Sequence, residues 1–272
     1  MIKDITIGQF FPGESVIHRL DARVKLILSF AFIVMLFAAK DAFGLAVSVV
    51  FMLGAFVLSG IPFSLMLKSL KPMIPILIFT AVLNLFFMKS GDVLFGFWKI
   101  QITTGGVSFT AFMLVRIIAL IIGTSLLTYT TSPIDLTDAI ERLFSPLKKI
   151  KVPVHELAMI MTIALRFIPT LIEETDKITS AQKARGAEID SGGLKSRVKA
   201  LVTIIIPLLV SSLRRAEELA LAMECRCYHG GEGRTRMKQL KLGIRDAWAS
   251  AVTAAFFTGV ILLNVANLAA RL

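Results

Sequence analysis

Two similar segments decide the fold of this chain. The first reads Arg166-Phe-Ile-Pro-Thr-Leu-Ile-Glu-Glu174 and ends at Ala184-Arg185-Gly186. The second reads Ile206-Pro-Leu-Leu209, continues through Arg214-Arg-Ala-Glu-Glu218 and ends at Cys225-Arg226-Cys227. In each, an apolar run with a proline leads into a glutamate pair and ends with one arginine between small residues. The region that holds them, residues 133–231, is too polar for a bilayer and too apolar for a loop, which predicts a helical arm on a membrane domain.

Composition places the sequence on either side of this region in a membrane. The 272 residues are 56% hydrophobic and 18% charged, with a mean hydropathy of +0.77. Soluble domains average about 25% charged residues, so this chain has too few charges to cover its apolar content with a water-facing surface. The net charge of +11 does not indicate nucleic acid, because membrane proteins concentrate Lys and Arg in cytoplasmic segments. We therefore expect membrane lipid, and no nucleic acid, among the partners.

Five apolar runs predict membrane spans, at residues 24–39, 43–59, 73–88, 108–129 and 247–268. The first two are short against the roughly 20 residues that cross a bilayer, so either a tight hairpin or one long re-entrant or strongly tilted element would accommodate them. The Gly- and Thr-rich residues 89–107 predict an external loop, with a small hairpin as one option. The expected fold class is all-α, a polytopic membrane protein with about five transmembrane helices and an arm of about three coupling helices. Its domains are 1–130 (four spans), 131–246 (the arm) and 247–272 (the last span).

Orientation follows from the distribution of Lys and Arg, which favours the cytoplasmic side. Nineteen of the 30 basic residues fall in residues 130–246, whereas the predicted outer segments hold four. With five spans, this places the N-terminus and the arm in the cytoplasm. Cys225 and Cys227 agree with that side, because one intervening residue makes a disulfide between them strained and reduced thiols are typical of the cytosol.

Three helices are predicted within the arm, at about residues 135–151, 154–183 and 194–227. Thr131-Ser132-Pro133 is a helix-start signal for the first. Its apolar residues recur at three- and four-residue spacing, which indicates an amphipathic face: Leu136, Ile140, Leu143, Phe144 and Leu147. Pro169 and Pro207 lie inside the second and third helices and predict a bend in each.

Arg185 and Arg226 each lie near the end of a predicted helix. One interpretation is structural: Gly186 suits the residue after a helix end, and an arginine in the last turn meets the negative end of the helix dipole. The other is a docking role, since small neighbours allow close approach of a partner and a guanidinium offers five donors. The occurrence of two such arginines, closing two similar helices, favours docking.

The sequence resembles a known family, the transmembrane T components of energy-coupling-factor (ECF) transporters, the EcfT/CbiQ family. The residues that carry the resemblance occur in order along most of the chain: Leu20-Asp-Ala-Arg-Val-Lys-Leu26, Ser145-Pro-Leu-Lys-Lys149, Val152-Pro-Val-His-Glu156, Leu165-Arg-Phe-Ile-Pro-Thr170, Ala181-Gln-Lys-Ala-Arg-Gly186 and Met223-Glu-Cys-Arg-Cys-Tyr228. The second small–Arg–small triplet differs from the more usual pattern by having Cys on both sides.

The resemblance implies a non-catalytic subunit in a prokaryotic plasma membrane. In that family two X-Arg-X motifs enter grooves in two ATP-binding subunits, which form a homo- or heterodimer, and an apolar arm surface holds a substrate-binding S component. The six contact residues would be Ala184, Arg185, Gly186, Cys225, Arg226 and Cys227. The substrate would be a vitamin or a metal ion, and the chain itself would need no cofactor because its partners bind ATP.

Two other classes of protein are weighed against this interpretation. A membrane metalloenzyme would need a ligand set, but His155-Glu156 is followed by Met159 where a zinc motif has its second His, and Cys225-x-Cys227-x-His229 lacks an evident fourth ligand. A stand-alone secondary transporter or channel usually keeps acids within its spans, and here all 19 lie outside them. Arg116, within the run 108–129, is the only candidate for a buried charge, and pairing to backbone carbonyls or snorkelling is favoured over a substrate site.

Overall fold

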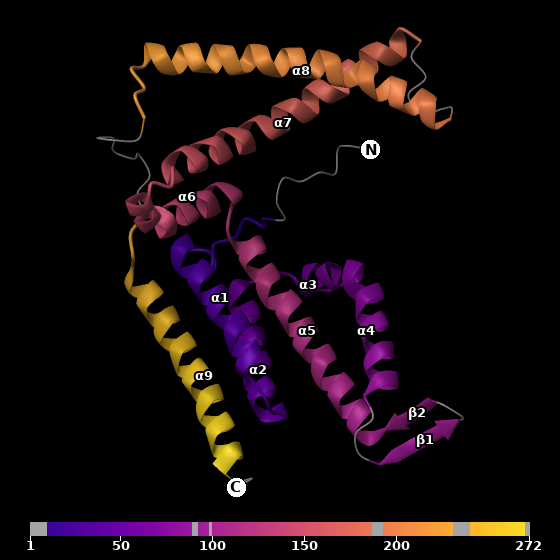
Figure 1. The fold of residues 1–272 in the computed structure, drawn as a ribbon. Coiled ribbons are helices and arrows are strands. Elements are labelled where there is room, and N and C mark those ends of the chain that lie inside the picture. The colour runs from indigo at the N-terminus through magenta and orange to yellow at the C-terminus, as the bar shows by residue number, and fades with distance from the viewer. Residues whose placement is uncertain (1–9, 89–91, 98–99, 187–192, 231–239, 270–272) are drawn as a thin grey trace. The chain divides into compact units, whose positions relative to one another are not determined.

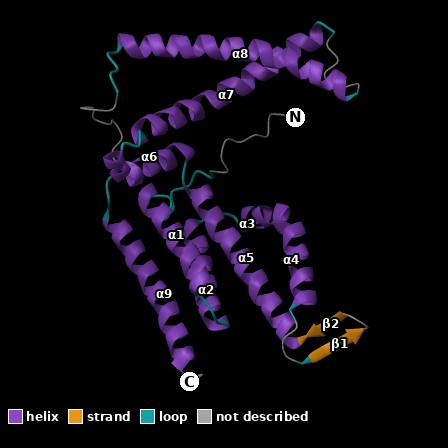
Figure 2. Ribbon diagram, viewed as in Figure 1, coloured by secondary structure: helices purple, strands orange, loops and turns teal. Residues whose placement is uncertain are grey.

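The computed structural model describes residues 10–88, 92–97, 100–186, 193–230 and 240–269 (Figure 1). These residues are predominantly helical, with one two-stranded hairpin (Figure 2), so the predicted all-α membrane class is confirmed. Two compact units divide the described residues. We call residues 10–139 and 240–269 the membrane unit, and residues 140–230 the arm unit.

Five helices of the membrane unit correspond to the five predicted apolar runs: α1 (Ala22–Ala38), α2 (Ala42–Ser59), α4 (Ile74–Phe87), α5 (Thr104–Thr130) and α9 (Ile244–Ala269). A further helix, α3 (Phe63–Leu70), lies between the second and third runs. A short 3-10 turn, Lys71–Met73, joins α3 to α4, and the left-handed backbone of Gly60 (φ +68°) ends α2. The strands β1 (Val93–Phe97) and β2 (Ile100–Thr103) pair antiparallel with Phe97 opposite Ile100, which confirms the small hairpin.

The start of α5 differs from the sequence-based expectation by four residues. The run was predicted from residue 108, because Gly105 and Gly106 favour a loop. Instead, the Thr103 hydroxyl caps the helix by accepting a hydrogen bond from the Gly106 amide at 3.1 Å. A Cβ at Gly106 would lie 2.7 Å from the Met88 carbonyl oxygen. This glycine therefore permits a close approach of backbones rather than ending a helix.

The core of the membrane unit lies between α1, α2, α5 and α9. Phe32 packs directly against the backbone of Gly123, where a Cβ would be only 2.1 Å from the ring, and its ring centroid is 6.1 Å from that of Phe51. Small residues at such crossings are typical of membrane helices, which associate by close packing. Outward-facing side chains are strongly exposed, with Val57 at 78% and Phe87 at 80%. An apolar exterior of this kind suits lipid rather than water.

A polar cluster at the N-terminal end of α1 explains the motif at residues 20–26. Asp21 caps α1 and pairs with Arg23 at 2.8 Å, and its amide donates to the carboxylate of Asp246 at 2.9 Å. The Lys25 ammonium donates to the carbonyl oxygen of Thr130 at 2.7 Å. These bonds join the first turns of α1 and α9 to the last turn of α5. From the local residues alone, this motif reads only as a basic lead-in to apolar sequence.

Arg116 has a structural partner inside the membrane unit. Its guanidinium donates to the Ala39 carbonyl oxygen, at the end of α1 where backbone acceptors lack helical donors. The same guanidinium lies 4.6 Å from the centroid of the Phe112 ring. Pairing to a backbone carbonyl, the favoured interpretation, is confirmed.

Among the described residues, five helical segments are long and apolar enough to cross a membrane: α2, residues 63–87 (α3 through α4), α5, α7 and α9. Four of them correspond to predicted spans. The first predicted span is α1, which has only 17 residues. The long helix α7, predicted in the arm, qualifies by length and composition. The chain is therefore a multi-pass membrane protein, and the arm assignment of α7 belongs to the proposal below.

The arm unit is built from three long elements, as predicted. They are α6 (Pro133–Phe144), which begins in the membrane unit, α7 (Val154–Ala184) and α8 (Leu194–Cys225). The first is shorter than the predicted 135–151, because Ser145-Pro146 ends it and a 3-10 turn, Ser145–Ile150, follows. The compact units divide within α6 and before residue 240, whereas the boundaries proposed at 130/131 and 246/247 concern the membrane and stay predictions.

Candidate docking site

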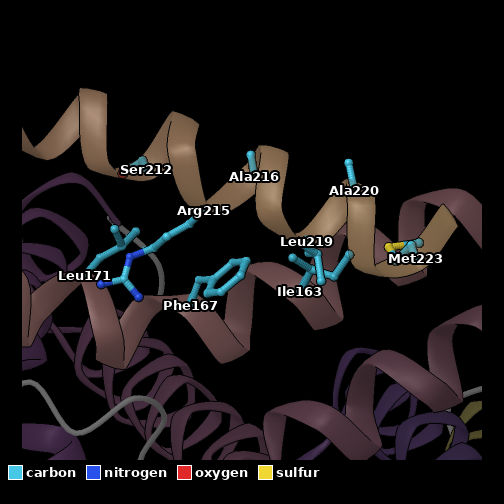
Figure 3. Close-up of a pocket in the computed structure, with 9 residues that line it drawn as sticks. All are labelled: Ile163, Phe167, Leu171, Ser212, Arg215, Ala216, Leu219, Ala220 and Met223. Carbon is cyan, nitrogen blue, oxygen red and sulfur yellow. The ribbon is translucent and has the colours of Figure 1, made fainter. Parts of the chain in front are cut away.

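The two helices that carry the predicted docking residues cross each other in opposite directions. Figure 3 shows Leu171 of α7 beside Ser212 and Arg215 of α8 at one end of the contact, and Ile163 near Leu219 and Met223 at the other. An ion pair joins the helices, with 2.7 Å between Arg215 Nη2 and Glu174 Oε2. The Ser211 hydroxyl donates to the other carboxylate oxygen of Glu174. The Glu174 carboxylate, which follows Pro169 on α7, is therefore held by Ser211 and Arg215, which follow Pro207 on α8.

An apolar groove of about 280 Å³ lies along this crossing. Phe167 and Leu171 line it from α7, and Ala216 and Ala220 line it from α8 (Figure 3). The alanines keep the groove open, because larger side chains at those positions would fill it. The groove was not predicted, although small residues four apart on one helix face were visible in the sequence.

The first predicted tip, Ala184-Arg185-Gly186, ends α7. Ala184 is the last helical residue and Arg185 is the cap. Gly186 follows with φ +82°, the left-handed conformation that glycine adopts readily, and its amide donates to the Lys183 carbonyl at 3.0 Å. All three residues are exposed. The predicted role of Gly186 as the residue after the helix end is confirmed.

The second predicted tip, Cys225-Arg226-Cys227, ends α8 with the same turn. Cys227 has φ +55°, its amide donates to the Glu224 carbonyl at 2.8 Å, and the Tyr228 amide donates to the Met223 carbonyl at 3.0 Å. These two bonds form a Schellman motif, which usually has glycine where Cys227 stands. Both thiols are free and all three residues are exposed.

The antiparallel crossing points the two tips in opposite directions. Arg185 lies eleven residues beyond Glu174 on α7, and Arg226 lies eleven residues beyond Arg215 on α8. At 1.5 Å per residue, each arginine is about 16 Å along its helix axis from the ion pair. The structure thus separates the six predicted residues into two sites of equal reach.

Pro169 and Pro207 lie inside helices that are assigned without interruption. Each proline lacks the amide that would bond to the carbonyl four residues earlier, at Leu165 and Thr203. The predicted bends at these positions stay predictions.

The residues considered for a metal site have other contacts. His155 Nδ1 lies 3.0 Å from Glu141 Oε1, so this histidine joins α7 to α6. His229 Nδ1 lies 2.9 Å from the carbonyl oxygen of Cys227. Within the described parts of the chain, no group of three or more His, Cys, Asp or Glu side chains is placed to hold a metal ion.

Comparisons with known proteins agree with this architecture. A family described as cobalt transport protein, CbiQ, matches residues 13–239. The chain is 55% identical over 251 residues to the energy-coupling factor transporter transmembrane protein EcfT of Clostridium kluyveri, which covers 92% of this chain and 93% of that protein. It is 50% identical to EcfT of Ruminiclostridium cellulolyticum (97% and 98% covered) and 49% identical to EcfT of Bacillus subtilis (88% and 91% covered).

These similarities define the class first, a non-catalytic membrane subunit of a transporter. Within that class, the chain belongs to the CbiQ/EcfT family, the transmembrane T components of ECF transporters. The family resemblance inferred from the sequence is thereby confirmed.

Proposed function

We propose that this chain couples ATP hydrolysis by two partner subunits to the uptake of a vitamin or a metal ion by an S component. The partners would be two ATP-binding subunits, as a homo- or heterodimer, and one substrate-binding protein. Arg185 and Arg226 would each enter a groove on one ATP-binding subunit. No ATP or other cofactor would bind to this chain.

The observation that carries the proposal is the matched geometry of the two tips. Each arginine caps a helix of more than 30 residues, is exposed, and is followed by a left-handed residue that turns the chain away. A guanidinium at such an end stands clear of its own helix and can donate to carboxylates or carbonyls of a partner. Opposite directions and equal reach suit two separate subunits better than one shared groove.

The crossing of α7 and α8 would transmit the motion. When ATP closes the nucleotide-binding pair, the two docked tips would move. Because Arg215, Glu174 and Ser211 join the helices midway between the tips, a displacement at one tip would move the other helix as well. Exposed apolar side chains such as Leu201, Ile205 and Leu209 on α8 would bind the S component. The S component would then release its substrate inward.

The proposal places the arm and the N-terminus in the cytoplasm of a prokaryotic cell. Support comes from the 19 basic residues in residues 130–246, since Lys and Arg favour that side. The uncharged apolar run of α7, Leu157–Leu165, is about half of the length that crosses a bilayer, whereas the helix as a whole is long and apolar enough to cross one. In this orientation it would pack against the S component or lie at the interface.

Copurification tests the docking role. The tagged full chain carrying Arg185→Ala and Arg226→Ala would be purified from its native host, and bound ATP-binding subunits and ATP-driven uptake would be measured. We expect normal membrane insertion with loss of uptake. A matched variant, Lys177→Ala with Arg214→Ala, removes two exposed charges from the same helices away from the tips and should behave as wild type. Retained subunits and uptake in the tip variant would contradict the proposal, as would uptake by the chain reconstituted alone.

A further inference from the structure

The segment between α6 and α7 has a surface that the docking role does not use. We call residues 144–152 the basic connector. Lys148, Lys149 and Lys151 are all exposed within it. From Arg142 to His155 the sequence contains four Lys and Arg but neither Asp nor Glu. The connector is therefore a concentrated patch of positive charge.

Apolar side chains accompany these lysines. Ile150 is 71% exposed, more than any other large apolar side chain described in the arm unit, and Phe144 is 50% exposed. Phe144 was predicted to join the amphipathic face of the first arm helix, whereas the other four residues of that face are half-buried. The exposed phenyl ring therefore departs from the pattern that packs this helix.

The backbone holds Ile150 at the apex of a turn. Lys151 adopts a left-handed conformation with φ +63°, and its amide donates to the Lys148 carbonyl at 3.0 Å. The chain turns here directly after the 3-10 turn Ser145–Ile150, so that Ile150 lies between the exposed Lys149 and Lys151. The contact of His155 with Glu141 at 3.0 Å ties the two ends of the connector together. Glu141 is the nearest carboxylate before the connector in the sequence, and it is buried.

We propose that the basic connector binds the anionic lipid headgroups of a membrane leaflet, with Ile150 and Phe144 inserted at the edge of the acyl chains. Lysines that bind lipid phosphates beside apolar side chains that enter the leaflet are the two features of interfacial anchors. A bilayer is also within reach. The helix α6 begins three residues after α5, a membrane-spanning helix, and its 12 residues extend about 18 Å.

An acidic protein surface would satisfy the lysines but would not favour the exposure of Ile150 and Phe144 beside them. The inference requires only that the chain spans a membrane. It does not depend on the docking of ATP-binding subunits, and the experiment that tests it uses the chain without those subunits.

Fluorescence from the connector tests the inference in the full chain. Cys225→Ser and Cys227→Ser remove the two thiols of the sequence, and Ile150→Cys then accepts an environment-sensitive nitrobenzoxadiazole label. The protein is placed in nanodiscs of phosphatidylcholine alone or mixed with phosphatidylglycerol. We expect a blue shift of the emission in the mixed lipid, with quenching by lipids spin-labelled on their acyl chains.

Neutralising the lysines should release the label. Each lysine near an anionic surface contributes about a fivefold factor to binding, so Lys148→Gln, Lys149→Gln and Lys151→Gln together should lower the ratio of bound to free connector by more than about tenfold. A matched triple variant, Lys177→Gln, Lys183→Gln and Arg214→Gln, changes the net charge equally and should leave the emission unaltered. In a second labelled protein, Val152→Cys carries the label instead, so that residue 150 stays isoleucine. Adding Ile150→Asp to this protein should also release the connector from the lipid.

Three results would overturn the inference. The first is the same emission in both lipids, and the second is quenching that survives the connector triple variant. The third is an emission shift that appears only when an acidic protein partner is added, which would assign the patch to that partner instead.

Discussion

The two tips of the arm unit share a backbone turn but build it with different residues. At the end of α7 the left-handed position is Gly186, which adopts φ +82° without a side-chain clash. At the end of α8 the same position is Cys227, with φ +55°, a conformation that costs an L-residue about 1–2 kcal/mol. The second tip therefore carries a thiol where the first carries a hydrogen atom.

The difference teaches that glycine is not what the two tips have in common. They share an exposed arginine at the cap, a small residue on either side and a chain that turns away immediately afterwards. This is the shape that a groove in another subunit would accept. Glycine supplies the turn at no conformational cost, and cysteine supplies it within the same small volume.

Reversing the charge at either tip should have the largest effect. Removing one partner of an interfacial charge pair costs about 2–5 kcal/mol, so Arg185→Glu and Arg226→Glu should each weaken binding of an ATP-binding subunit by at least about 30-fold. Pull-down of the tagged chain, with the subunits quantified by mass spectrometry, measures this. Loss in one variant alone would break the equivalence of the tips, and normal yield in both would remove the docking role.

Thiol protection compares the tips position by position. Cys225 and Ala184 are the last residues of α8 and α7. In the first protein Cys227 is replaced by serine, so that Cys225 is the only thiol. In the matched protein both native cysteines are replaced by serine, and Ala184→Cys supplies the only thiol. Because thiol modification follows exposure, both should react with a maleimide at least about tenfold more slowly when the ATP-binding subunits are bound. Equal rates with and without those subunits would show that the tip stays exposed to solvent.

Exchanging the left-handed residues should change the stability of the two helix ends moderately and with opposite signs. Gly186→Ala should destabilise the end of α7 by about 1 kcal/mol, whereas Cys227→Gly should stabilise the end of α8 by a similar amount. Hydrogen exchange of the amides of residue 186 and of Tyr228 reports each turn. Cys225→Ser alters a thiol without changing the left-handed residue and serves as the control. Identical signs at both ends would disprove the proposed cause.

Removing the ion pair between α7 and α8 should have the smallest effect on stability. The Glu174–Arg215 pair is partly exposed, with side-chain accessibilities of 19% and 38%, so its coupling energy should be about 0.5–1 kcal/mol. A double-mutant cycle with Glu174→Gln and Arg215→Met, measured by unfolding of the purified chain, isolates it. A coupling energy near zero would mean that Glu174 relies on Ser211 alone.

Much of the fold followed from apolar runs and breakers. The five runs predicted five helices of the membrane unit, and the predicted end of the second run at residue 59 matches the end of α2, because these signals depend only on local residues. The start of α5 and the end of α6 were misplaced. A hydroxyl cap and a backbone contact between distant residues override the glycines in the first case, and Ser145-Pro146 ends the helix in the second.

The features that the sequence did not predict are contacts between segments far apart. Nothing local to Lys25 indicates that its ammonium meets the Thr130 carbonyl, and nothing local to Glu174 indicates Ser211 and Arg215. The six tip residues were located because helix ends have local signatures. Their placement in opposite directions depends on the crossing of α7 and α8, which no single segment encodes.

The eleven-residue interval between the ion pair and each arginine has a rotational consequence. Eleven residues complete three helical turns to within about 20°, so Arg185 emerges on the flank of α7 that holds Glu174, and Arg226 on the flank of α8 that holds Arg215. Inserting one alanine between residues 174 and 185 would lengthen α7 by only about 1.5 Å but would swing its guanidinium by about 100°. The phase of each helix, more than its length, would then determine whether both arginines can meet their grooves at once.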